Sequence, residues 1–186
     1  MRWESWLADN HELPGGVWLK IAKKGSGETS VSRAEALDAA LCYGWIDSKA
    51  KSLDEACYLQ KFTRRRARSL WSKVNVEKVE ALIAAGRMQA PGLAEILAAQ
   101  ADGRWDAAYE SPTNAVVPPD LAAALAHSEQ ARDFYLSLSR ADQYAVVFRL
   151  MTTPTPAGRA GRLQRMIAKL EAGDRSATKR SGTQFR

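Results

Sequence analysis

The sequence predicts an α+β fold, with a small antiparallel sheet and helices in the N-terminal part and an all-helical C-terminal part. Three short segments rich in β-forming residues occur early in the chain, at 17–22, 45–49 and 56–62. Beyond residue 72, apolar residues recur with a helical period of about 3.6 residues. A chain of 186 residues, 46% of them hydrophobic, can fold without the support of a metal or a disulfide.

The N-terminal part alternates helices with the strand-like segments. Apolar residues at i, i+3 and i+4 predict a helix over residues 1–10, and a strand follows at 17–22. Ser32 and Glu35 form a capping-box pattern before the next helix, and Gly44 stands where a helix C-terminal glycine belongs. The short link between the second and third strands favours an antiparallel hairpin. We therefore expect a small sheet with helices on one face.

The rest of the chain reads as helices separated by glycine and proline breaks. We expect three parts: residues 1–72 with the sheet, a helical part over 73–173, and a disordered basic tail over 174–186. Helices are predicted at about 72–85, 91–101, 120–126, 129–138, 140–151 and 157–172.

The remaining composition argues against several classes of protein. The N-terminus lacks the pattern of a signal peptide, and no stretch approaches the roughly 20 apolar residues of a membrane span. We therefore expect a cytoplasmic protein without membrane insertion. Cys42 and Cys57 lie in apolar segments and are expected as small buried hydrophobes, with a disulfide or redox pair as the alternative. Neither His11 nor His127 has a companion at metal-ligand spacing, so no metal or other cofactor is expected.

Positive charge is concentrated in one segment. The net charge is +6, and residues 61–78 hold seven bases against the single acid Glu77, so the remainder of the chain is neutral overall. Arginine suits bidentate contact with phosphate or carboxylate, and Trp71 and Phe62 offer rings on which bases can stack. The candidate anion- or nucleic-acid-binding residues, named here the basic strip, are Arg64, Arg65, Arg66, Arg68, Trp71, Ser72 and Lys73. The alternative is a structural elbow, with Trp71 in the core and the arginines joining sheet to helix.

Two further hypotheses stay open at this stage. An enzyme of unknown type would use Asp47, in the second strand beside Trp45, together with Tyr43, Tyr58 or the arginines at a cleft. The alternative is that Asp47 caps a turn or pairs with one of the arginines. A module for a protein partner or a homodimer would use the C-terminal helices. That module requires an exposed apolar seam on the last helix, formed by Leu163, Met166, Ile167 and Leu170. The basic residues on the same helix are more typical of a solvated face; they are Arg159, Arg162, Arg165 and Lys169.

Several strings together resemble a known family. AALCYGWID at 39–47, FTRRR at 62–66 and WSKVN at 71–75 are similar to the YdeI/OmpD-associated family, whose members are often labelled bacteriocin-protection proteins. The likeness continues at 82–88, 101–109 and 159–170, and spans about 18–173. Arg65 departs from the pattern, which has proline there. The resemblance implies a bacterial α+β protein with a helical C-terminal part and a non-enzymatic role in envelope stress or resistance to antimicrobial peptides.

Overall fold

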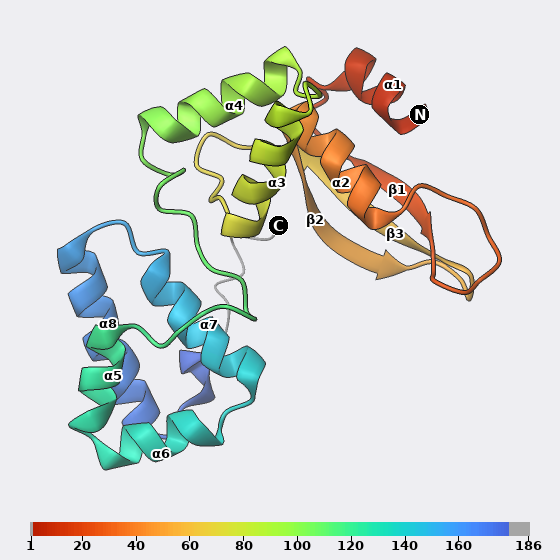
Figure 1. The fold of residues 1–186 in the computed structure, drawn as a ribbon. Coiled ribbons are helices and arrows are strands. Elements are labelled where there is room, and N and C mark those ends of the chain that lie inside the picture. The colour runs from red at the N-terminus through yellow and green to blue at the C-terminus, as the bar shows by residue number, and fades with distance from the viewer. Residues whose placement is uncertain (1, 179–186) are drawn as a thin grey trace. The chain divides into compact units, whose positions relative to one another are not determined.

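A computed structural model describes residues 2–178 of the chain and leaves residues 1 and 179–186 undescribed. The chain divides after Asp106 into an N-terminal unit and a C-terminal unit (Figure 1). Strands occur in the N-terminal unit and the C-terminal unit is helical, so the predicted α+β class is confirmed.

Three strands and four helices build the N-terminal unit. The strands form an antiparallel sheet in the order β1-β3-β2, and β2 and β3 make the predicted hairpin. The elements are α1 (Arg2–Asn10), β1 (Val17–Ala22), α2 (Arg33–Cys42), β2 (Trp45–Ser52), β3 (Cys57–Arg64), α3 (Lys73–Ala84) and α4 (Ala90–Ala101).

Local sequence signals fix both ends of α2. The Ser32 hydroxyl accepts a hydrogen bond from the Glu35 amide at 3.2 Å, and the Ser32 amide donates to the Glu35 carboxylate at 2.9 Å. This reciprocal pair is the predicted capping box. Gly44 ends the helix with a φ of +74°, a left-handed conformation that favours glycine. The turn into β2 therefore follows directly from the sequence.

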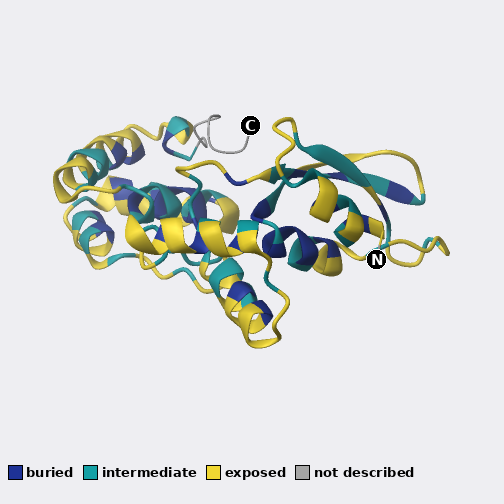
Figure 2. Ribbon diagram, turned by 90° about the horizontal axis from the view of Figure 1, so that it is seen from above, coloured by how far each residue is buried: buried dark blue, intermediate teal, exposed yellow. Residues whose placement is uncertain are grey.

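One face of the sheet carries the core of this unit. Helices α1 and α2 supply Trp3, Leu7 and three alanines, which pack with residues from all three strands, Ile21, Trp45 and Phe62. Figure 2 shows this burial along α2 and the strands. Side chains alternate along a strand, so in each strand the residues next to a core residue point to the opposite face of the sheet.

Helices α3 and α4 pack against α2 and so lie in the N-terminal unit. The boundary between the compact units falls after residue 106, within the helical part expected to begin at residue 73. The contact between α2 and α4 is close, because the amide of Gln89 donates to the Cys42 carbonyl at 3.1 Å.

The C-terminal unit consists of α5 (Pro119–Ala126), α6 (Glu129–Ser137), α7 (Arg140–Met151), α8 (Pro156–Glu171) and the short 3-10 helix η1 (Arg175–Ala177). Their shared core includes Leu121, Leu150 and Leu170. Residues 174–178, expected to belong to a disordered tail, are ordered here: Ala177 is buried, and its carbonyl accepts a 2.7 Å hydrogen bond from Arg149. The remainder of that expected tail, 179–186, lies outside the described residues.

Candidate anion-binding surface

The basic strip begins at the end of β3 and continues through a connecting loop into α3. Its members divide into two groups according to burial. Arg65 and Trp71 are 4% and 2% exposed, whereas Arg64, Arg66, Arg68 and Lys73 are exposed. One run of basic residues thus contains both an internal contact and an external cationic surface.

The buried pair forms the elbow between sheet and helix. The Arg65 guanidinium carbon lies 3.5 Å from the centre of the Trp71 ring, and Arg65 Nη1 donates to the Leu70 carbonyl at 3.2 Å. The Arg65 amide also donates to the Gly44 carbonyl at 2.9 Å, which links the elbow to the turn before β2. This arrangement is the one that the structural-elbow hypothesis describes, and it applies to Arg65 and Trp71.

Neighbouring groups hold the loop between these two residues. Arg104 donates to the Ser69 carbonyl at 3.0 Å while its Nε is 2.7 Å from a carboxylate oxygen of Asp102. The Trp105 ring packs against Trp71 with 4.9 Å between ring centres. Ser72 caps α3, since its hydroxyl accepts from the Asn75 amide at 3.2 Å. The loop therefore has a defined conformation from which the other arginines project.

The aromatic rings expected to stack on bases are not at the surface. Phe62 is 0% exposed and Trp71 is 2% exposed, so neither ring offers a face to a ligand in this structure. The exposed members Arg64, Arg66 and Arg68 form no ion pair with any carboxylate among residues 2–178. The unpaired charge of the basic strip therefore comes from these three arginines.

A second cationic surface, on the sheet, was not predicted from the sequence. Trp18 lies on the face opposite the core, paired with Lys61 of β3. The ammonium groups of Lys51 and Lys61 lie 4.6 Å and 6.0 Å from the centre of the Trp18 ring. By strand alternation and register, the face also includes Lys20 and Leu59, and we name these five residues the cationic sheet face.

The cationic sheet face combines an aromatic ring with three positive charges and no acid. Lys20 and Lys51 are exposed, and Trp18 and Lys61 are half-buried. Its members come from three strands and are up to 43 positions apart, from Trp18 to Lys61. The only signal in the sequence was alternation within each strand, and alternation does not specify which strands are neighbours.

The residues of the enzyme hypothesis occupy other surroundings. Asp47 accepts a 2.6 Å hydrogen bond from Arg33 in an ion pair, and the Asp47 side chain is 15% exposed. Burial raises the pKa of the Tyr43 hydroxyl, and Glu4 adds to that rise. The N-terminal unit has an apolar cavity between α1 and β1, and none of Asp47, Tyr43 and Tyr58 lines it. Asp47 thus serves the alternative role considered for it, as the partner of an arginine.

The apolar seam of α8 lies within the core of the C-terminal unit. Met166 and Leu170 are buried, and Leu163 and Ile167 pack against the same cluster. An interaction module that uses this seam requires it to be exposed, so its burial counts against that hypothesis. Of the basic residues on α8, Arg159 pairs with both carboxylate oxygens of Asp120, at 2.7 and 2.8 Å.

Cys42 and Cys57 are free and buried, as expected of small apolar side chains. Burial raises the pKa of the Cys42 thiol. In the described part of the chain, no three His, Cys, Asp or Glu side chains gather as a metal site. No helix over residues 2–178 combines the length and apolarity needed to cross a bilayer.

Two family models match different parts of the chain. Residues 1–95, just over half of the 186, match a domain of unknown function, DUF8412. The chain belongs to the DUF8412 family. The basic strip and the cationic sheet face both lie within this DUF8412 region.

The second match is to the family described as bacteriocin-protection, YdeI or OmpD-associated, over residues 114–173. These residues form a YdeI/OmpD-associated domain within the C-terminal unit. The string at 159–170 lies inside this match. The strings at 39–47, 62–66, 71–75 and 82–88 lie instead in the DUF8412 region, and 101–109 lies between the two. Neither the curated proteins nor the solved structures give a match to the chain.

Proposed function

We propose that this DUF8412 protein is a non-enzymatic protection protein of the YdeI/OmpD-associated type whose N-terminal unit binds single-stranded nucleic acid. The observation that carries the binding proposal is the pair of exposed cationic surfaces at β3. Lys61 contributes to the cationic sheet face, and Arg66 and Arg68 follow the end of the same strand. The YdeI/OmpD-associated match supports the protection role.

The chemistry of both surfaces suits a phosphodiester backbone. Lysine and arginine neutralise phosphates, and an aromatic ring on a sheet offers a face on which a base can stack. Lys51 lies over the Trp18 ring, so a base that stacks on this ring would displace the Lys51 ammonium group toward a phosphate. Because Trp71 and Phe62 are buried, Trp18 takes the stacking role first assigned to them.

Fluorescence anisotropy with labelled single-stranded and duplex oligonucleotides, across a salt series, tests this proposal. Two double variants, Arg66→Ala/Arg68→Ala and Lys51→Ala/Lys61→Ala, each remove two exposed or half-buried cations. Each should lower the slope of log affinity against log salt by about 1.4, at roughly 0.7 per phosphate contact with a single strand. Arg140→Ala/Arg165→Ala, which removes two exposed arginines from the C-terminal unit, is the matched control.

Trp18→Leu separates stacking from charge. It should weaken single-strand binding about tenfold, within the range for loss of one base–aromatic stack, and leave duplex binding unchanged. Absence of binding at low salt overturns the proposal. So does binding whose affinity and salt slope are the same in all three double variants.

A further inference from the structure

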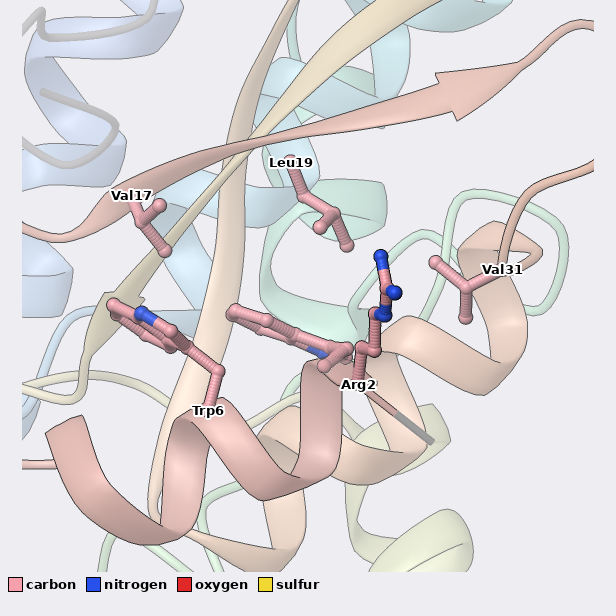
Figure 3. Close-up of a pocket in the computed structure, with 6 residues that line it drawn as sticks. Arg2, Trp6, Val17, Leu19 and Val31 are labelled. Atoms are coloured by element: carbon pink, nitrogen blue, oxygen red, sulfur yellow. The ribbon is translucent and has the colours of Figure 1, made fainter.

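The N-terminal unit also contains an apolar cavity, separate from the cationic surfaces. Its volume is about 360 Å³, and it lies between α1 and β1 (Figure 3). Val17 and Leu19 face it, whereas Trp18 between them belongs to the opposite face of the sheet. The residues that line it are Arg2, Trp3, Trp6, Val17, Leu19 and Val31.

Aromatic packing fixes one wall of the cavity. The rings of Trp3 and Trp6 stack with 5.5 Å between their centres and 12° between their planes. Trp45 packs its edge against both rings, with interplanar angles of 84° and 89°. The Trp3 indole N–H donates to the Ala36 carbonyl at 3.0 Å. This wall is therefore held from behind by the core and presents apolar surface to the cavity.

Among the lining residues, Arg2 is the one that carries a charge, and it lies beside this apolar wall. Figure 3 shows the Arg2 guanidinium beside Leu19 and Val31. Arg2 is exposed, and its guanidinium makes no hydrogen bond or ion pair within residues 2–178. The other five lining residues carry no charge. A guanidinium in this position has its donors available for a carboxylate, which it can bind through two parallel hydrogen bonds.

We propose that this cavity binds a small apolar carboxylate, with the apolar body against the tryptophans and the carboxylate on Arg2. The volume lies at the lower end of the range of roughly 300–1,000 Å³ for small-molecule sites, which restricts the ligand to a single small ring system or a short acyl chain. Mostly apolar walls with one convergent polar group are typical of such sites. The bound carboxylate would accept hydrogen bonds from the Arg2 guanidinium, and the apolar body would cover the exposed side of Val17, Leu19 and Trp6.

Isothermal titration calorimetry of the full chain with four probes tests the proposal. Indole-3-acetate represents an aromatic carboxylate and octanoate an aliphatic one. The corresponding amides have the same apolar bodies but lack the negative charge. Either carboxylate should bind at least tenfold more tightly than its amide. The heat capacity change should be negative because apolar surface is buried. The carboxylate that binds more tightly identifies the source.

Two variants test whether the ligand binds in this cavity. Arg2→Gln should lower carboxylate affinity at least tenfold and leave amide affinity unchanged, whereas Val31→Trp should lower both by filling the cavity. Arg68→Ala, which removes a cation from the basic strip, should leave all four affinities unchanged. Failure of both carboxylates to bind at millimolar concentration overturns the proposal, as does equal affinity for acid and amide. Neither result bears on the proposed nucleic-acid binding, since Arg2 lies outside both cationic surfaces.

Discussion

The Arg65 guanidinium carbon lies 3.5 Å from the centre of the Trp71 ring, and both side chains are almost completely buried. The contact joins the residue directly after β3 to the residue that precedes the cap of α3. A desolvated cation over the face of a tryptophan is worth about 2 kcal/mol or more. Arg65 therefore stabilises the connection between sheet and helix, whereas its neighbours Arg64 and Arg66 face solvent.

Arg65→Ala should lower the free energy of unfolding by about 2 kcal/mol, because it removes the stacked cation and leaves space beside Trp71. Arg66→Ala, the adjacent exposed arginine, is the matched control and should change it by no more than about 0.5 kcal/mol. Urea unfolding followed by tryptophan fluorescence measures both. Equal losses from the two variants would refute a special role for Arg65.

Gly92→Ala should be destabilising even though alanine favours helices. A Cβ at residue 92 would clash with the Cys42 carbonyl oxygen, a backbone atom that cannot move without shifting α2. Such overpacking typically costs about 1–3 kcal/mol. Gly161 is the matched helical control, since its added Cβ would lie 3.4 Å from the flexible end of the Arg165 side chain.

The measurement for this pair is the midpoint of thermal unfolding. Gly161→Ala should raise the midpoint in the C-terminal unit, because helix propensity improves by up to about 1 kcal/mol. Gly92→Ala should lower the midpoint in the N-terminal unit. A higher unfolding midpoint in both variants would show that α4 can move away from α2 with no loss of stability.

Short-range signals predicted the elements well, because the relevant contacts are local. The Ser32–Glu35 capping box and the turn at Gly44 each depend on residues within a few positions, and both are confirmed. The site was harder to predict. Arg64, Arg65 and Arg66 are the same residue type in one run, and only the tertiary contact with Trp71 determines which one is buried. The proximity of Lys51 to Trp18 likewise requires β3 to lie between β1 and β2, and no local pattern specifies that order.

Cys42 and Cys57 should both be unreactive toward a thiol reagent such as DTNB in the native protein. Each is buried, and burial raises the pKa of the Cys42 thiol, which lowers the fraction of reactive thiolate. Two thiols per chain should react in denaturant and none rapidly without it. If one thiol reacts rapidly in the native protein, that cysteine is accessible to the reagent. If fewer than two thiols react in denaturant, part of the cysteine is oxidised.

The ion pair between Asp120 and Arg159 should make the stability of the C-terminal unit depend on pH. Hydrogen bonds from Arg159 to both oxygens lower the pKa of the Asp120 carboxyl, and they outweigh its partial burial. A lowered pKa in the folded state means that the stabilisation is complete above the unfolded pKa of about 3.9. It is lost as the pH falls through the lower pKa of the folded state.

Asp120→Asn should therefore lower the free energy of unfolding by about 1 kcal/mol at neutral pH, a modest value because both side chains are about one-third exposed. The difference from the parent protein should shrink as the pH falls below about 4, where the parent loses the carboxylate as well. Asp133→Asn is the control, since Asp133 is 63% exposed and approaches Arg132 at 3.3 Å. Chemical unfolding of the three proteins between pH 7 and pH 2.5 measures the effect. A gap that stays constant across this range would place the contribution of Asp120 in its hydrogen-bond geometry, independent of its charge.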